Sequence, residues 1–359
     1  MRSLREKIGQ MIMVGCQGES LSRDERLIFA EYDFGGFILF RQNCRAPRQI
    51  LSLCRDLWQG ASSQPPLIAI DQEGGKIHRL PHPFTHFPAA AEIGARNDRG
   101  LAYRAGRATA SELALVGINL DFAPVLDVNS NPANPIIGAR AFGLEPNFVT
   151  AMSSAWMRGL REGGIIPCGK HFPGHGGTDK DSHFDLPVVS KSLAEIQAVE
   201  LPPFVDACRN GIEALMTAHV KFTALDPNHV ATLSEPIVTG LLRHQLGYDG
   251  VVFSDDMEMK AIGDHYDAAN AAALALRAGV DVMLFCHDLA KAVQAMECLC
   301  AEAAREPALR AHVEASYRRI AALKQHGLKE FTGVAENQLE DRLKNLDHRS
   351  IVEEIHGNW

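Results

Sequence analysis

Short apolar runs recur along the chain and alternate with longer stretches in which apolar residues repeat at helical spacing. The runs lack the apolar–polar alternation of strands that face water on one side. We therefore expect strands that are buried on both faces of a parallel sheet. The predicted strands are residues 11–14, 37–40, 67–70, 118–122, 166–169, 214–217, 251–253 and 282–285.

Helical spacing predicts six helices between these strands, at residues 47–59, 100–116, 147–162, 193–210, 235–246 and 268–278. A glycine stands at the end of each, where a left-handed residue commonly closes a helix. These glycines are Gly60, Gly117, Gly163, Gly211, Gly247 and Gly279. Two further outer helices are expected at 289–304 and 308–325.

Alternating strands and helices of this number predict an α/β fold, a single-domain (β/α)8 barrel of the TIM type. The competing fold is an open doubly wound sheet, whose first strand–helix turn should carry a Gly-x-Gly-x-x-Gly phosphate loop. Residues 15–18, Gly-Cys-Gln-Gly, do not supply one. With no linker-like segment before residue 325, we expect residues 1–328 to form the catalytic barrel domain and the charged tail 329–359 to pack on it.

Composition narrows the class of protein. Hydrophobic residues make up 46% of the chain and charged residues 22%, as in folded globular proteins and unlike disordered ones. A diffuse net charge of −8 gives no footprint for nucleic acid or an anionic membrane. The N-terminus is charged before any apolar stretch develops, and the most apolar stretch carries Arg277 and Asp281. We expect neither a signal-peptide core nor a membrane span.

Polar residues follow almost every predicted strand. In a barrel, the carboxyl ends of the strands form the active-site face, so we expect these side chains to share one pocket. A single carboxylate there could simply cap the next helix, but so many together favour a site. They are Asp71 and Glu73 after the third strand, Asp121 and Asp127 after the fourth, Lys170 and His171 after the fifth, His219 after the sixth, Asp255 and Asp256 after the seventh, and His287 after the eighth.

The segment after the fifth strand, KHFPGHGGTDKDSHFDLP, is long for a barrel loop, and such loops are usually functional. Asp181 stands two residues before His183, so its carboxylate could accept the ring N–H. That contact would raise the pKa of His183 and suit it to general acid/base catalysis. The alternative is a loop held by side chain–backbone bonds with His183 simply solvated, and the spacing does not decide between them.

Asp255 and Asp256 are adjacent, so at a strand end we expect one to enter the barrel mouth and the other to cap a helix or hold a neighbour. A carboxylate on a rigid strand end suits a nucleophile. A zinc site built from His171, His175, His183 and His219 is the metal alternative, but the early strands lack the His-x-His expected of zinc-dependent barrel hydrolases. We expect neither a metal nor an organic cofactor.

Several motifs resemble those of a known family. The most specific is Lys-His-Phe-Pro-Gly-His-Gly at 170–176 followed by Asp181-Ser182-His183. Others are Asp-Gln-Glu-Gly-Gly at 71–75, Ala-Pro-Val-Leu-Asp at 123–127, Ile137-Gly138 through Arg140, Ala218-His219 and Phe-Ser-Asp-Asp at 253–256. In these motifs the chain resembles the single-domain bacterial β-N-acetylhexosaminidases of glycoside hydrolase family 3, the NagZ type. It departs at Lys76-Ile77, where the family often has Arg-Val, and at Thr217, where Pro is common.

The resemblance implies that Asp255 is the nucleophile, His183 the acid/base residue and Asp181 its partner. It also implies a set of sugar-binding residues: Asp71, Arg79, Arg140, Lys170, His171 and His219. The implied activity is that of a retaining exo-β-N-acetylglucosaminidase acting on carbohydrate, with peptidoglycan-derived muropeptides as substrate. Together with the missing signal-peptide core, the resemblance implies a cytoplasmic protein, which we expect to be a monomer. The alternatives are a related family 3 exo-β-glycosidase or glycoside phosphorylase, and a non-catalytic sugar-binding barrel.

Overall fold

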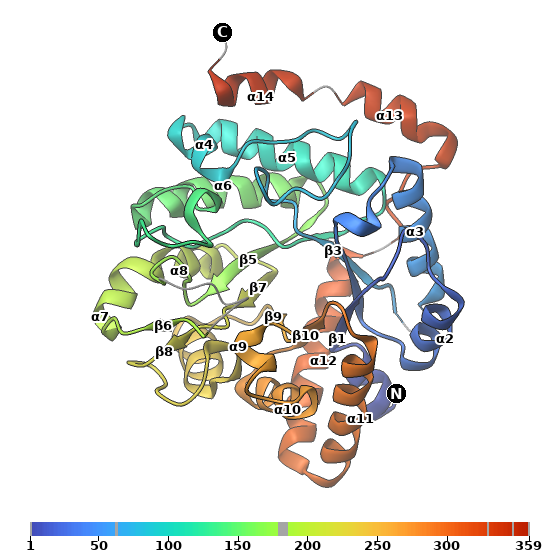
Figure 1. The fold of residues 1–359 in the computed structure, drawn as a ribbon, viewed down its shortest axis with the longest axis vertical. Helices are drawn as coiled ribbons and strands as arrows, with labels where there is room; N and C mark the ends of the chain where they lie inside the picture. The colour runs from blue at the N-terminus through green and yellow to red at the C-terminus, as the bar shows by residue number, and fades with distance from the viewer. Residues whose placement is uncertain (1, 62–63, 179–185, 329, 347, 358–359) are drawn as a thin grey trace.

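The structure is a computed structural model that describes residues 2–61, 64–178, 186–328, 330–346 and 348–357. Within these residues, parallel strands close into a barrel in the order β1-β10-β9-β7-β5-β4-β3-β2, with helices around it (Figure 1). The strands are β1 (Ile12–Gly15), β2 (Gly36–Leu39), β3 (Leu67–Ile70), β4 (Leu120–Asp121), β5 (Ile166–Phe172), β7 (Ala214–Thr217), β9 (Val251–Asp256) and β10 (Val282–Phe285). The predicted barrel is confirmed, and the open doubly wound sheet is wrong.

The strand ends show how the sequence positions the site. The apolar runs at 67–70, 214–217 and 282–285 coincide with β3, β7 and β10. β5 and β9 run past their apolar runs, because the polar residues that follow continue the pairing: Lys170 and Phe172 of β5 pair with β7. Lys170, His171 and Asp255 therefore lie on strands and not on loops. A small sheet of β6 (Val188–Val189) and β8 (Lys221–Phe222) is too short to predict from an apolar run.

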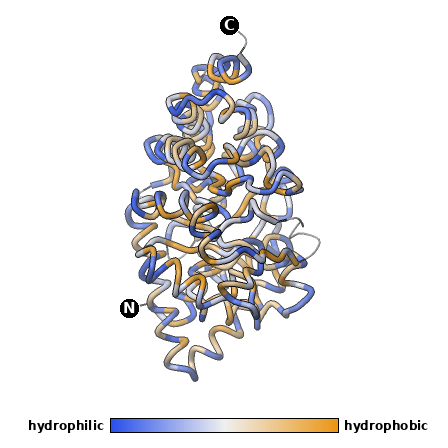
Figure 2. Tube along the Cα trace, turned by 90° about the vertical axis from the view of Figure 1, so that its left-hand side faces the viewer, coloured by the Kyte–Doolittle hydropathy of each residue, from blue (hydrophilic) through white to orange (hydrophobic). Residues whose placement is uncertain are grey.

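Most predicted helices are present. The helices are α1 (Leu4–Gly9), α2 (Arg23–Tyr32), α3 (Pro47–Gly60), α4 (Ala90–Ala95), α5 (Arg99–Leu115), α6 (Pro146–Glu162), α7 (Leu193–Glu195), α8 (Pro202–Arg209), α9 (Lys260–Gly263), α10 (Ala268–Ala278), α11 (Leu289–Arg305), α12 (Pro307–Gly327), α13 (Leu339–Asn345) and α14 (Arg349–His356). Hydrophobic and hydrophilic turns alternate along the helices, as expected of elements that bury one face (Figure 2).

Two predicted helices differ from those in the structure, and two of the glycines predicted to close a helix do not do so. The helix expected at 193–210 is divided into α7, the π-helical segment η3 (Ile196–Glu200) and α8, because Pro202 and Pro203 lack the N–H groups of an uninterrupted helix. The helix expected at 235–246 is the π-helical η5 (Pro236–Gln245). Gly60 is the last residue of α3, and Gly163 has φ −80°, so the left-handed turn after α6 falls on Gly164 at φ +86°.

The C-terminal helices α13 and α14 lie against α4 and α5 at the top of Figure 1. Leu339 and Ile355 are buried, and Arg104 Nη2 lies 2.6 Å from Glu354 Oε2. These contacts support the proposal that residues 329–359 are a tail on a barrel domain of residues 1–328. Of the helices in the described part of the chain, none has the length and apolar character needed to span a bilayer.

A buried ion cluster joins the outer helices to the barrel. Asp281, which is fully buried just before β10, accepts hydrogen bonds from Arg243 Nη2 at 2.6 Å and Arg319 Nη2 at 2.8 Å. Arg243 lies in η5 and Arg319 in α12, so a single carboxylate connects two outer elements to β10.

Asp281→Ala is expected to lower the free energy of unfolding by about 3–5 kcal/mol, because it leaves two arginines without their buried partner. Urea unfolding followed by circular dichroism measures the change. The matched control is Asp249→Ala, since Asp249 also faces Arg319, at 3.9 Å, but is 93% exposed and should contribute at most about 0.5 kcal/mol. Equal losses in the two variants would contradict this role for the cluster.

Candidate active site

The polar strand ends converge on a cavity of about 180 Å³ at the barrel mouth. Six of the predicted site residues line it: Asp71, Arg79, Arg140, Lys170, His171 and Asp255. They come from the ends of β3, β5 and β9 and from the loops after β3 and β4. Asp181 and His183 lie outside the described residues, so the predicted acid/base pair stays a prediction.

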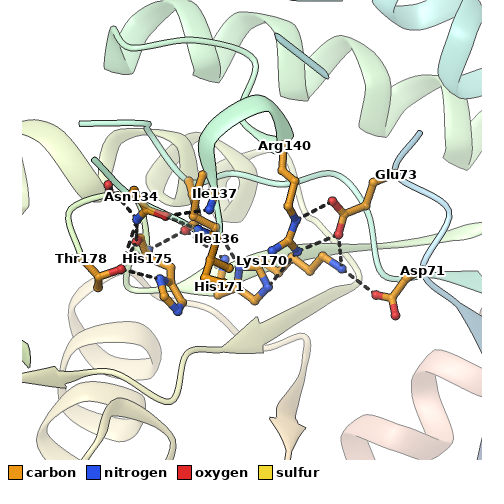
Figure 3. Close-up of polar contacts among 12 residues, drawn as sticks. Asp71, Glu73, Asn134, Ile136, Ile137, Arg140, Lys170, His171, His175 and Thr178 are labelled. Carbon is orange, nitrogen blue, oxygen red and sulfur yellow. Dashed lines mark hydrogen bonds and ion pairs between the residues drawn. The ribbon is translucent and has the colours of Figure 1, made fainter. Parts of the chain in front are cut away.

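Lys170 is the centre of the charged network in this cavity (Figure 3). Its Nζ lies 2.7 Å from Asp71 Oδ1 and 2.6 Å from Glu73 Oε1, and its side chain is only 3% exposed. Arg140 makes a bidentate contact with Glu73, at 2.8 and 2.9 Å. A chain of alternating charges, Asp71–Lys170–Glu73–Arg140, therefore runs across the site.

The network sets the charge of its members. Burial alone would raise the pKa of Glu73, but the charges of Arg140 and Lys170 outweigh it and hold that pKa well below the usual range. The pKa of Lys170 is raised, because Asp71 and Glu73 outweigh the cost of burying the ammonium. The site thus presents fixed charges, which suit recognition of hydroxyl groups by charge-assisted hydrogen bonds.

His171 is oriented by a buried carboxylate. Its Nδ1 lies 2.7 Å from Asp127 Oδ2, and Asp127 Oδ1 accepts the main-chain N–H groups of His171 and His175. Burial alone would raise the pKa of Asp127, but the neighbouring His171 and the hydrogen bonds that Asp127 accepts have the larger, opposite effect. The pKa is therefore lowered, and the carboxylate is ionised. An ionised carboxylate only accepts, so Nδ1 carries a proton, and Nε2 faces the donor Arg140 Nη2 at 3.5 Å.

The start of the unusual loop after β5 is held from inside the protein. Asn134 Nδ2 donates to the carbonyl groups of His175 and Gly176, while its Oδ1 accepts from the main chain of Ile137 at 2.7 Å (Figure 3). A Cβ at Gly176 would lie 1.6 Å from the carbonyl oxygen of Val128, so only glycine fits there. Burial lowers the pKa of His175 to about 4, and its neutral ring contacts Thr178.

Asp255 and Asp256 end β9 with different surroundings. Asp255 lines the cavity, and its Oδ1 accepts the N–H of Asp256 at 2.8 Å. Asp256 also borders the cavity, but its Oδ1 accepts from the main chain of Glu258 and, at 3.4 Å, from Cys286 after β10. As expected, one carboxylate of the pair holds a neighbouring segment. Burial raises the pKa of Asp256 to about 6.

His219 is not among the described residues that line the cavity. It is fully buried, with Nδ1 2.7 Å from Thr232 Oγ1 and Nε2 2.9 Å from the carbonyl oxygen of Asp256. This ring supports the strand end next to Asp255 from behind. A direct contact between His219 and a sugar stays a prediction.

Two residues of the site were not given roles from the sequence. Glu73 and Asp127 both occur in quoted motifs, but nothing in the sequence shows that Glu73 contacts Arg140 or that Asp127 orients His171. The signal that could have found them is burial: both are carboxylates in the segments that follow apolar strands, and a buried carboxylate needs a cation or hydrogen-bond donors.

The histidines do not gather around a common centre in the described part of the chain. The rings of His171 and His175 lie 5.8 Å apart and contact Asp127 and Thr178, respectively. Within those residues no group of three or more His, Cys, Asp or Glu side chains is arranged to hold a metal ion. The expectation that the protein needs no metal or cofactor stays a prediction.

Lys170→Met is expected to lower kcat/KM about a hundredfold, because the charge that orders Asp71 and Glu73 is lost. The free energy of unfolding should fall by about 3–5 kcal/mol near neutral pH, since Glu73 and Asp71 lose a buried partner. Ionised Glu73 stabilises the fold above its unfolded pKa of about 4.3, and this contribution is lost as the pH falls. The difference in the free energy of unfolding between wild type and variant should therefore become smaller as the pH falls.

Activity assays and urea unfolding from neutral to acidic pH check this prediction. Lys291→Met is the control, because Lys291 is 45% exposed and lies 3.5 Å from Glu258 outside the network. A Lys170→Met enzyme with the activity and stability of the control would contradict the role of the network.

A closed (β/α)8 barrel with a charged cavity at the carboxyl ends of its strands defines a barrel enzyme that takes a polar ligand. Comparison with known proteins makes the class specific. Residues 3–323 match the family described as Glycosyl hydrolase family 3 N terminal domain. The chain belongs to glycosyl hydrolase family 3 and is a glycoside hydrolase, as the motifs predicted.

Relatives and solved structures agree with this assignment. The chain is 37% identical to the "Beta-hexosaminidase" of Alkalilimnicola ehrlichii over 282 residues, which is 77% of this chain and 80% of the relative. A family 3 β-N-acetylglucosaminidase from Paenibacillus sp. superposes with a TM-score of 0.88 at 38% identity, covering 96% of this chain and 68% of that one. NagZ from Neisseria gonorrhoeae, in complex with N-trifluoroacetyl-D-glucosamine, superposes with a TM-score of 0.74 at 29% identity, covering 94% and 97%.

Proposed function

We propose that the protein is a retaining exo-β-N-acetylglucosaminidase that removes terminal β-linked N-acetylglucosamine. The observation that carries the proposal is that Asp255 and the Asp71–Lys170–Glu73–Arg140 network share one cavity in a chain of this family. Relatives named β-hexosaminidase and the NagZ complex with a glucosamine derivative support the choice of sugar.

The size of the cavity supports exo action. Its volume of about 180 Å³ is below the roughly 300–1,000 Å³ of pockets that enclose drug-sized ligands. A cavity of that size suits one terminal sugar better than a long stretch of oligosaccharide. Asp71, Arg79, Lys170 and His171 would bind its hydroxyl groups, with His171 Nε2 accepting and Lys170 Nζ donating.

In the proposed mechanism, Asp255 attacks the anomeric carbon and the bond to the leaving oxygen breaks. His183 protonates that oxygen, assisted by Asp181, which holds the ring N–H. A covalent glycosyl-enzyme on Asp255 results, and His183 then removes a proton from the attacking water, which releases the sugar with retained configuration. The histidine replaces the second carboxylate that most retaining glycosidases use.

The proposed natural substrates are peptidoglycan-derived muropeptides with terminal N-acetylglucosamine, cleaved in the cytoplasm by a monomeric enzyme. The resemblance of the loop motif to the NagZ type supports this choice of substrate.

A panel of 4-nitrophenyl β-glycosides, with proton NMR to follow the anomer first released, tests the proposal. We expect turnover of the N-acetylglucosaminide well above that of the glucoside and xyloside, and β-N-acetylglucosamine as the first product. Sugar 1-phosphate formed when phosphate is added would show a phosphorylase instead. Absence of turnover for every glycoside would favour a sugar-binding barrel.

A further inference from the structure

A second, larger cavity adjoins the sugar cavity. It has a volume of about 1,110 Å³ and is lined mainly by residues of the loops after β2 and β3, together with Glu19, Ala139 and His356 of α14. Three pairs of consecutive residues divide between the two cavities: Phe40, Ile77 and Arg140 line the sugar cavity, while their neighbours Arg41, Lys76 and Ala139 line the larger one. Arg79 lines both. The two cavities therefore meet at these three pairs of residues and share Arg79.

The larger cavity is cationic in a protein of net charge −8. Arg41, Arg45, Lys76 and Arg79 line it, against the carboxylates of Glu19 and Glu92. Glu19 is paired with Arg45 at 2.9 Å. Within the described residues, the side chains of Arg41 and Lys76 form neither a hydrogen bond nor an ion pair. These two cations are available to a ligand.

The walls of this cavity are held in place. Gln72 Oε1 accepts the main-chain N–H of Arg79 at 2.9 Å, and its Nε2 donates to His78 Nδ1 at 2.7 Å. The ring of His78 stacks on that of His86 at 4.1 Å, and burial lowers the pKa of His78 to about 4. The stacked rings offer a flat surface, and Arg41, Arg45, Lys76 and Arg79 supply positive charge around it. This wall of the cavity is therefore fixed by its own hydrogen bonds and ring contact.

The barrel order shows which end of the sugar faces the second cavity. Three strands separate β3 from β9 in either direction round the closed barrel, so the two strands are opposite each other. Asp255 ends β9, while Asp71 follows β3 and Arg79 lies in the loop beyond. A sugar with its anomeric carbon at Asp255 therefore directs its far end toward Asp71 and Arg79. The cationic cavity lies beyond that end.

We propose that the cationic cavity binds an anionic substituent carried by the terminal sugar, at the end away from the anomeric carbon. A sulfate, phosphate or carboxylate there would contact Arg41, Lys76 and Arg79. Asp71 does not oppose this, because Lys170 lies 2.7 Å from its Oδ1 and compensates its charge. The inference rests on the proposed function, since Asp255 marks the position of the anomeric carbon.

The test compares three substrates: 4-nitrophenyl β-N-acetylglucosaminide, its 6-O-sulfate and its 6-O-methyl ether. We expect the sulfate to be cleaved with a higher kcat/KM than the methyl ether, and to lose this advantage at high salt. Arg41→Ala and Lys76→Ala should each lower the ratio of kcat/KM between sulfate and parent sugar by about three- to tenfold. Arg48→Ala is the matched control: Arg48 is 55% exposed, is paired with Glu340, and should leave the ratio unchanged.

Two results would overturn the inference. One is cleavage of the parent sugar with no cleavage of the sulfate; the other is an unchanged ratio in both cavity variants. A further comparison uses carboxyphenyl and phenyl N-acetylglucosaminides, in which the negative charge is on the aglycone. If Arg41→Ala and Lys76→Ala lower kcat/KM only for the carboxyphenyl substrate, the cavity faces the other end of the substrate. If no glycoside is cleaved, the proposed function fails, and calorimetric binding of N-acetylglucosamine 6-sulfate against N-acetylglucosamine still tests the cavity.

Discussion

Asp255→Ala should lower kcat by at least about three orders of magnitude, because the variant lacks the group that attacks the anomeric carbon. Asp255 lines the cavity at a strand end and contributes little to packing, so the fold should persist. Steady-state kinetics on 4-nitrophenyl β-N-acetylglucosaminide, with urea unfolding as a check of the fold, measures the effect.

Added azide sharpens this prediction. In the Asp255→Ala enzyme, azide can enter from the face that the carboxylate occupied, so the rescued product should be the α-glycosyl azide. Asp264→Ala is the control, since Asp264 is an exposed carboxylate a few residues further along the chain. A folded Asp255→Ala enzyme that keeps more than a few percent of wild-type kcat would show that the nucleophile is another residue.

His183→Ala is expected to produce the second large loss, and its size should depend on the leaving group. A sugar aglycone leaves only with a proton, so kcat/KM should fall by about three orders of magnitude. A dinitrophenyl group leaves with little need of a proton, so kcat/KM for a dinitrophenyl glycoside should fall far less. The measurement is kcat/KM for aryl glycosides whose leaving groups span several pKa units. It gives the slope of log kcat/KM against the pKa of the leaving group, which should be steeper in the variant than in wild type.

Asp181→Asn should show a milder version of the same dependence, because the imidazole stays but its tautomer and basicity change. Azide should rescue His183→Ala with the β-glycosyl azide, since the nucleophile is intact and azide then attacks the glycosyl-enzyme. A loss that is independent of the leaving group in both variants would mean that the segment only binds sugar and that the proton donor is elsewhere.

The fold could be predicted because strands buried on both faces leave a clear apolar signature. Residues 67–70, 214–217 and 282–285 are such runs, and each is a strand of the barrel. The prediction was weaker where polar residues continue a strand, as at Lys170 and His171. Sheet pairing and not side-chain polarity sets the end of a strand there.

The site was only partly predictable for a related reason. Placing Asp71, Lys170 and Asp255 at strand ends was enough to bring them to one mouth. The contacts that determine their chemistry join residues far apart in the chain: Glu73 to Arg140 and Asp127 to His171. No spacing rule reports such pairs. The π-helical segments were missed because their apolar residues repeat much as those of an α-helix do.

The cationic cavity illustrates the same limit. In the sequence, Lys76 stands out only as a departure from the family pattern, and nothing marks Arg41. The fold brings the two side chains to one cavity, because the loops after β2 and β3 both line it. Local sequence indicates which residues can do chemistry, and the barrel order indicates which of them face each other.

The most direct test of the mechanism is to identify the residue that carries the sugar during turnover. The enzyme is incubated with 5-fluoro-β-N-acetylglucosaminyl fluoride, which forms a glycosyl-enzyme quickly and releases it slowly, and the protein is digested for peptide mass mapping. The account predicts one fluorosugar per chain, attached to Asp255. A fluorosugar on another residue, or turnover of the reagent with no adduct, as when the acetamido group of the substrate acts as nucleophile, would contradict it.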